Sequence, residues 1–193
     1  MKRVGVLALQ GDFDAHVKAV ERAGAAAVEV RSAADLEDLD GLIIPGGEST
    51  TMLKLLCEEN LMEPLRQFGR RRPIFGTCAG AILLANEVSS PAQESLGLID
   101  IGVERNAYGR QIDSRVSSVT PEAEFQSRTA PGDMEAVFIR APIIRRVGNA
   151  ARVLARYQGD PVLVEEGRHM VATFHPELST DRRVHELFLQ KLD

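Results

Sequence analysis

The sequence has no tryptophan, only two cysteines, and aromatic residues at just 5% of its 193 positions. Two cysteines in a chain of this length do not make a disulfide framework, so we expect a reducing compartment, the cytoplasm. Long hydrophobic runs are also missing, because the run at residues 4–9 is too short for a secretory signal core or a membrane span. We therefore expect no membrane interaction and interpret residues 4–9 as a core strand.

The sequence also lacks a basic stretch that could bind nucleic acid. The net charge is −5, and the densest basic cluster, residues 70–72, precedes a predicted strand and is interpreted as a solvated helix end. Nucleic acid is therefore excluded as a partner. The remaining composition is ordinary for a globular protein, with 44% apolar and 26% charged residues, and the length predicts a single domain over residues 1–193.

The first half of the chain alternates buried strands with amphipathic helices. The predicted elements are strands at 4–9, 27–30, 42–44 and 73–75, and helices at 13–23, 51–57 and 63–69. This order predicts an α/β fold with a mainly parallel sheet and right-handed crossovers. Ligands of such sheets bind beyond the carboxyl ends of the strands, which places Gln10, residues 46–47 and Cys78 on one rim.

The second half changes to a series of shorter strands. The predicted elements are strands at 98–103, 112–119, 136–139, 153–157, 162–166 and 169–174, and a closing helix at 182–192. We expect these largely antiparallel strands to extend the parallel sheet. Residues 88–97 and 120–133 carry no pattern that predicts structure or function.

Residues 76–80, Gly-Thr-Cys-Ala-Gly, match a nucleophile elbow in which cysteine replaces serine. Gly76 and Gly80 omit the Cβ atoms that would collide in this tight strand-to-helix turn. The turn puts Cys78 at a helix N-terminus, where the dipole and the free N–H groups favour a thiolate. The alternative interpretation is a small buried cysteine under a glycine-rich turn.

His175 is the best-placed base among the four histidines, because it ends an apolar strand at the same rim. Pro176 favours an extended backbone at His175, and in an extended segment residues 175 and 177 point to the same side. Glu177 would then orient the imidazole. The alternative is a strand-end histidine beside a surface glutamate.

The other histidines and the second cysteine are given structural positions. His16 lies off the apolar stripe of its helix and is expected at the surface. His169 begins the strand that His175 follows, at its far end, and His185 lies in the last helix, so both are less well placed. Cys57 is interpreted as a residue that packs its helix against the core.

Acyl transfer at Cys78 also needs hydrogen-bond donors for an oxyanion. The N–H of Ala79, directly after the nucleophile, is one donor by elbow geometry. Gly46 and Gly47 are the natural second source, since glycine allows a close backbone approach on the neighbouring loop. The alternative for residues 45–47 is a plain turn.

Six motifs resemble those of the class I, triad-type glutamine amidotransferases, and in particular the glutaminase subunits of pyridoxal 5′-phosphate synthases. They are residues 7–13 (LALQGDF), 45–50 (PGGEST), 76–80 (GTCAG), 103–111 (VERNAYGRQ), 138–142 (FIRAP) and 174–178 (FHPEL). The motifs stand in the family's order and cover nearly the whole chain. The resemblance implies a three-layer, flavodoxin-like fold of the class I amidotransferase type.

The resemblance also implies a reaction and a partner. L-Glutamine would be hydrolysed to L-glutamate and ammonia through a Cys78 thioester, with no cofactor and no metal. Ammonia would pass to a β/α-barrel synthase subunit in a large hetero-oligomer, and docking would act on Gln10 and residues 45–50. The implied glutamine-binding residues are Gly46, Gly47, Glu48, Arg105, Ile139 and Arg140, and the implied oxyanion donors are Gly47 and Ala79.

Three alternatives remain open from the sequence. Either arginine could form a surface salt bridge instead of binding the substrate's α-carboxylate, which a guanidinium group suits. The chain could be a glutaminase that serves another pathway. It could also be a non-catalytic cysteine sensor of related fold, although a sensor has no need for the full set of Cys78, His175 and Glu177.

Overall fold

The computed structural model describes residues 1–106 and 114–192. In the first half the elements are β1 (Arg3–Leu7), α1 (Phe13–Arg22), β2 (Ala26–Val30), η1 (Ala33–Leu36), β3 (Gly41–Ile44), α2 (Ser49–Glu58), α3 (Met62–Arg71), β4 (Ile74–Thr77), α4 (Ala79–Leu84), β5 (Ala85–Ser89) and β6 (Ile99–Glu104). In the second half they are β7 (Arg115–Val119), α5 (Ala123–Arg128), β8 (Met134–Phe138), β9 (Ile143–Val147), β10 (Arg152–Tyr157), β11 (Asp160–Glu166), β12 (His169–Ala172), η2 (Pro176–Leu178) and α6 (Arg183–Leu189).

The main sheet has the strand order β10-β11-β12-β4-β3-β1-β2 in the described part of the chain. From β2 to β12 every neighbouring pair is parallel, whereas β11 and β10 add antiparallel strands at one edge. The predicted mainly parallel sheet with an antiparallel extension is therefore confirmed. No helix of the described residues is long and apolar enough to cross a membrane.

The second half departs from the prediction of one continuous extension. A tight hairpin joins β11 and β12, which pair antiparallel. On its other side β12 pairs parallel with β4. The remaining strands form two smaller sheets, β5-β6-β9 and β7-β8. Strands β5 and β9 and the short helix α5 were not predicted, because they occur in segments with no clear periodicity. Residues 112–113 of the predicted strand at 112–119 lie outside the described residues.

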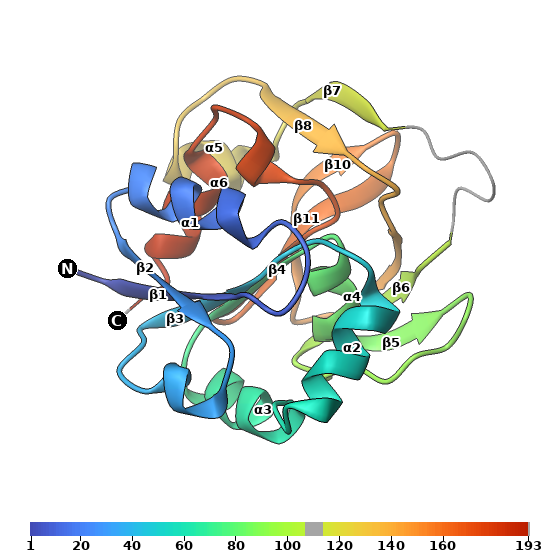
Figure 1. Cartoon of the computed structure of the whole chain (residues 1–193). Coiled ribbons are helices and arrows are strands. Elements are labelled where there is room, and N and C mark those ends of the chain that lie inside the picture. Colours follow the sequence, from blue (N-terminus) through green and yellow to red (C-terminus); the bar gives the residue numbers. More distant parts are fainter. Residues whose placement is uncertain (107–113, 193) are drawn as a thin grey trace.

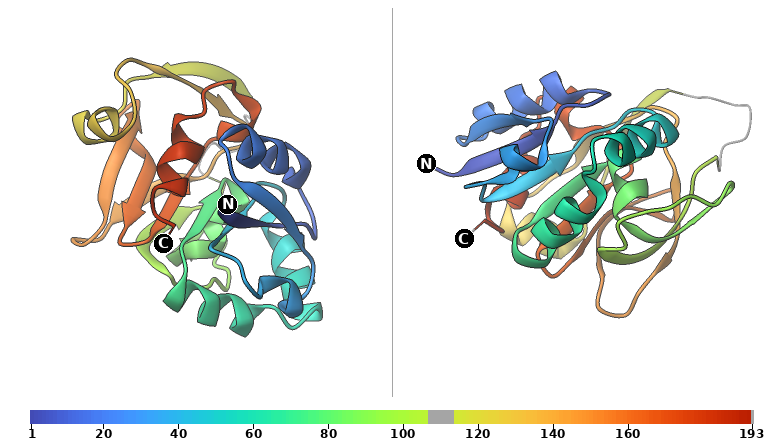
Figure 2. Two further views of the ribbon diagram at one scale, coloured as in Figure 1. Left: turned by 90° about the vertical axis from the view of Figure 1, so that its left-hand side faces the viewer. Right: turned by 60° about the horizontal axis from the view of Figure 1, so that its bottom comes forward.

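Side chains alternate along the central strands, so each face of the sheet carries its own apolar core. In β3, Leu42 and Ile44 belong to the core formed with α2, α3 and α4, whereas Ile43 belongs to the core formed with α1 and α6. Figure 1 and the left panel of Figure 2 show α1 (blue) and α6 (red) on one face and α2 and α3 on the other. This is the predicted three-layer arrangement.

The apolar side chains through which α2 packs on the core do not include Cys57. Met52 and Leu56 are the fully buried apolar residues of this helix, and Cys57 is exposed. The prediction that Cys57 packs against the core was wrong because position 57 lies just beside the buried stripe.

Candidate active site

Cys78 occupies a strained turn between β4 and α4. Its backbone has φ 49° and ψ −105°, and a positive φ is uncommon for a residue other than glycine. The flanking glycines make the turn possible, because a Cβ on Gly76 would lie 2.4 Å from the Gly80 oxygen. A Cβ on Gly80 would lie 2.0 Å from the Ile44 oxygen. The predicted elbow is thus present, with a buried thiol that donates to the Ile139 carbonyl at 3.8 Å.

His175 and Glu177 are in direct contact, with 2.6 Å between Nδ1 and Oε1. The predicted extended backbone is wrong, because Pro176–Leu178 forms the 3₁₀ turn η2. Proline suits the first position of such a turn, since its fixed φ is helical and its missing N–H needs no acceptor there. The backbone N–H of His175 donates to Val137 of β8 at 2.8 Å, which holds the imidazole at the rim.

Gly46 brings Cys78 and His175 together. A Cβ on Gly46 would lie 2.4 Å from Cε1 of His175 and 3.3 Å from Cβ of Cys78, so both side chains border the same glycine. Burial lowers the pKa of His175, but interactions with the Cys78 and Glu177 side chains outweigh it and raise the pKa to about 10. The imidazole therefore interacts with both the thiol and the carboxylate.

The loops after β1 and β3 meet at the rim, as predicted. Oε1 of Gln10 accepts a hydrogen bond from the Glu48 N–H at 3.1 Å, and the Asp12 N–H donates to the Gly46 carbonyl at 3.1 Å. Gly47 has φ 155°, and a Cβ there would lie 2.4 Å from Oε1 of Gln10. The loop that carries the predicted oxyanion donor is therefore packed directly on Gln10.

The carboxylate of Glu48 caps α2 in this structure. It accepts from the backbone N–H groups of Thr50 and Thr51 at 3.2 and 2.7 Å. Burial raises the pKa of Glu48, but the hydrogen bonds from Thr51 and Thr50 outweigh it and lower the pKa. Arg105, directly after β6, donates to Oγ1 of Thr50 at 2.6 Å and lies 3.9 Å from Oε1 of Glu48. The structure therefore brings Arg105 to the loop at residues 46–50.

The other predicted glutamine-binding pair follows β8. Ile139 contributes its carbonyl beside the Cys78 thiol. Arg140 is exposed and has φ 46°, a second positive φ at this rim. Its side chain makes no hydrogen bond or ion pair among the described residues.

Sequence reasoning missed two histidines behind Glu177. His16 was expected at the surface but has 0% exposure, because it packs against His185 of α6, the helix that lies beside α1 on this face of the sheet. Its Nε2 lies 3.0 Å from Oγ1 of Thr77 and 3.3 Å from Oε2 of Glu177, and its Nδ1 lies 3.1 Å from Nε2 of His185. One signal was available: position 16 lies one helical turn after Asp12, on the side that faces the rim.

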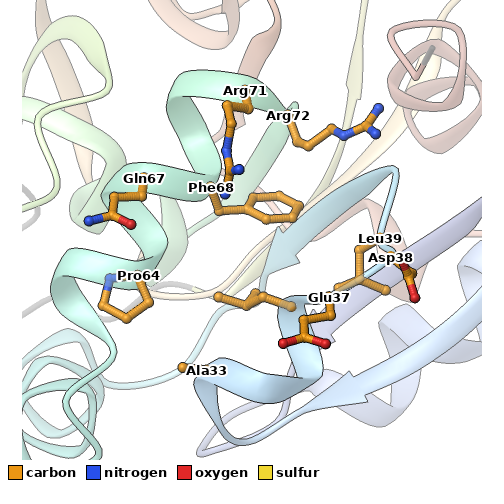
Figure 3. A pocket seen from close by; sticks show the side chains of 10 residues that line it. Ala33, Glu37, Asp38, Leu39, Pro64, Gln67, Phe68, Arg71 and Arg72 are labelled. Carbon is orange, nitrogen blue, oxygen red and sulfur yellow. The ribbon is translucent and has the colours of Figure 1, made fainter.

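One cavity among the described residues lies away from these side chains. A cavity of about 800 Å³ lies between η1 and α3, where side chains such as Glu37, Phe68 and Arg71 face one another (Figure 3). It is lined by no predicted site residue. A smaller cavity of about 330 Å³ borders Asp12 and Glu177.

One group of side chains in the described ranges could hold a metal ion, namely Asp12, His175 and Glu177, whose ligand atoms lie within 4.8 Å of one another. His175 and Glu177 already satisfy each other through their 2.6 Å hydrogen bond. Asp12 is half-exposed and lies 3.7 Å from Nδ1 of His175. The three side chains therefore form a hydrogen-bonded acid–base pair, His175 and Glu177, with Asp12 as a neighbouring carboxylate.

A model of the SNO glutamine amidotransferase family matches residues 6–193. The chain belongs to the SNO glutamine amidotransferase family. Its fold, with a mainly parallel sheet between two helical layers, is the fold that the sequence resemblance predicted.

Relatives of this SNO glutamine amidotransferase support the assignment. The chain is 66% identical over 192 residues to the pyridoxal 5′-phosphate synthase subunit PdxT of Solibacter usitatus (strain Ellin6076), and all of both chains is covered. It is 46% identical to a chain solved as the crystal structure of a glutamine amidotransferase, with a TM-score of 0.88 and 97% of each chain covered. The PurLQS structure from Thermotoga maritima shares the fold at 16% identity, with a TM-score of 0.77 and 98% coverage of each chain.

Proposed function

We propose that the chain is the glutaminase subunit of a pyridoxal 5′-phosphate synthase in the cytoplasm. As a single domain over residues 1–193, it hydrolyses L-glutamine to L-glutamate and delivers the ammonia to a β/α-barrel synthase subunit within a large hetero-oligomer. The similarity to PdxT of Solibacter usitatus over the full length of both chains supports the pathway and the partner. The chemistry rests on one observation, the contact of His175 with Glu177 beside the elbow cysteine.

Cys78 is the proposed nucleophile. His175 takes the thiol proton as the sulfur attacks the side-chain amide carbon, and gives it to the departing ammonia as the thioester forms. Water then attacks the thioester with His175 again acting as base. Glu177 fixes Nδ1 of the imidazole and stabilises the imidazolium, and the raised pKa of His175 supports this role.

The proposed oxyanion donors are the N–H groups of Gly47 and Ala79. Ala79 is the first residue of α4, where backbone N–H groups have no acceptor within the helix. Gly47 lies on the loop that Gln10 supports, so docking of the synthase at Gln10 and residues 45–50 has a direct route to this donor.

Glutamine is proposed to bind along the loop at residues 46–48 and against Arg105, Ile139 and Arg140. Arg105 is suited to the α-carboxylate, because a guanidinium group forms paired hydrogen bonds with a carboxylate. Since the Glu48 carboxylate already caps α2, this residue would contribute its backbone.

The decisive experiment measures ammonia release from glutamine with and without the synthase subunit. We expect ammonia release to depend on the partner and to be abolished by Cys78→Ala, and we expect this variant to remain folded. Cys57→Ala is the matched control, because Cys57 is exposed near the C-terminal end of α2, and it should keep full activity. Full activity in Cys78→Ala, or labelling of Cys57 instead of Cys78 by an electrophilic glutamine analogue, contradicts the proposal.

The pathway is tested separately. A glutaminase of another pathway would release ammonia but would neither co-purify with a pyridoxal 5′-phosphate-forming synthase nor support its product. A non-catalytic sensor would release no ammonia with any partner.

A further inference from the structure

The buried carboxylate of Glu177 has one oxygen that is held well and one that is not. Its side chain has 0% exposure, and Oε1 accepts from Nδ1 of His175 at 2.6 Å. Oε2 receives no hydrogen bond of good geometry from any residue in the described ranges. An unsatisfied buried acceptor costs about 1–3 kcal/mol, and a charged one costs more, so this oxygen needs a donor nearby.

His16 provides that donor group. Its Nε2 lies 3.3 Å from Oε2 of Glu177 and 3.0 Å from Oγ1 of Thr77. Its N–H therefore lies between two acceptors, and a small rotation of the ring or of the carboxylate moves the hydrogen bond from the hydroxyl to the carboxylate. Thr77 directly precedes the elbow cysteine, so the same contact links α1 to the strand that carries the nucleophile.

The hydrogen-bond partners determine which nitrogen of His16 carries the proton. Burial, followed by the charges of His185 and His175, keeps the pKa of His16 well below its usual value, so the ring is neutral at pH 7. Burial and the charge of Arg22 lower the pKa of His185 to about 4, so this ring is neutral as well. Because a carboxylate only accepts, the tautomer that fits has its proton on Nε2 of His16, and Nδ1 accepts from Nε2 of His185 at 3.1 Å.

We propose that His16 is a positioning residue of the glutaminase, donating from Nε2 to the second oxygen of Glu177 while Thr77 and His185 hold its ring. This inference rests on the triad assigned above. In the reaction His175 becomes charged, and the Glu177 carboxylate must face it without turning away. A neutral donor on the opposite side fixes the carboxylate and does not remove its negative charge, whereas a charged histidine there would compete with His175.

Three variants separate this role from simple packing. His16→Leu fills a similar volume but has no donor, and His16→Gln places an amide N–H near the position of Nε2. His169→Leu is the control, because His169 is also a buried histidine whose pKa is lowered to about 4, chiefly by burial. His169 instead accepts from the Ile74 N–H at 3.2 Å, at the opposite end of β12 from the triad.

The assay is steady-state glutamine hydrolysis in the presence of the synthase subunit, with each variant's folded fraction measured by thermal unfolding. We expect His16→Leu to lower kcat about 10- to 100-fold, because misplacing a catalytic group by about 1 Å costs on the order of 10²-fold. KM for glutamine should stay within about twofold, because His16 does not touch the substrate. His16→Gln should recover most of kcat, and His169→Leu should lower the melting temperature without lowering kcat.

The proposal is overturned if folded His16→Leu keeps kcat within about threefold of the wild type, or if His16→Gln is as impaired as His16→Leu. Should both fail to fold, Thr77→Val removes only the hydroxyl that holds Nε2. We expect it to lower kcat several-fold at constant KM, and an unchanged kcat again overturns the proposal. Cys78→Ala is measured alongside to give the background rate. A wild type that is no faster than this background rejects the glutaminase assignment. An active wild type whose kcat does not change on substitution of His16 rejects this inference alone.

Discussion

Replacing Gly46 with alanine tests whether the imidazole of His175 must lie directly against this backbone. Gly46 does not have a positive φ, so alanine fits its backbone conformation without strain. The added Cβ would lie 2.4 Å from Cε1 of His175 and 3.3 Å from Cβ of Cys78. The perturbation is therefore a single methyl group aimed at the contact between the proposed base and the proposed nucleophile.

The size of the effect follows from these distances. Carbon atoms in contact lie about 3.5–4.0 Å apart, so the ring or the loop at Gly46 must move by roughly 1 Å. Such a displacement of a catalytic group lowers the rate on the order of 10²-fold, which corresponds to about 2.7 kcal/mol in the activation free energy. Overpacking typically costs about 1–3 kcal/mol of stability, so the variant is expected to stay folded.

The assay is ammonia release with the synthase subunit, normalised to the folded fraction. Gly41→Ala is the matched control, because its Cβ would lie 2.5 Å from Cδ2 of Leu192, a similar clash in the core near α6. We expect Gly41→Ala to lower the melting temperature with kcat unchanged, and Gly46→Ala to lower kcat about 100-fold. A folded Gly46→Ala with wild-type kcat refutes the reasoning.

Three further predictions follow from the same geometry. The pKa of His175 rises from 6.5 to about 10 on folding, so the stability that this group contributes to the fold is complete below pH 6.5 and is lost as the pH rises through 10. Urea titrations should show this fall in the free energy of unfolding for the wild type and a flatter pH dependence for His175→Gln. Parallel curves for the two proteins would reject the shift. Gly80→Ala should destabilise by on the order of 3 kcal/mol in thermal unfolding, because its Cβ meets a backbone oxygen at 2.0 Å that cannot move alone; a shift of less than 1 °C would contradict this. Arg105→Lys should raise KM for glutamine roughly tenfold at similar kcat, since lysine cannot form the paired hydrogen bond, and an unchanged KM would remove Arg105 from the glutamine site.

The sequence predicted the parts of the site that depend on local backbone rules. The glycines at 76 and 80 predicted the elbow because the collisions they avoid occur within one strand-to-helix turn and its neighbouring strand. The contact between residues 175 and 177 was predicted on the assumption of an extended backbone, whereas the structure has a 3₁₀ turn at Pro176–Leu178. The contact is formed nevertheless, because His175 stands before the turn as its N-cap, with a non-helical backbone at φ −108° and ψ 85°, and meets Glu177 from there.

What the sequence could not predict depends on contacts between distant segments. His16 was expected at the surface because its neighbours in the helix give no sign of α6, which covers it through His185. Cys57 was placed in the core because a helical stripe alone does not fix the angle at which α2 meets the sheet. Within the described ranges, strands β5 and β9 pair only with β6, and such pairing has no signature in either segment alone.

The two separate cores also determine how the molecule opens. Strands β1, β3 and β4 are covered on both faces and paired on both edges, so their amides are expected to exchange with solvent only through large-scale opening of the molecule. The loops that carry the nucleophile and the oxyanion donors begin at the ends of these strands. Hydrogen exchange should therefore be slowest in the strands that anchor the site and faster in the two-stranded ribbon β7-β8, so local fluctuations of that ribbon leave the anchors of the reacting groups in position.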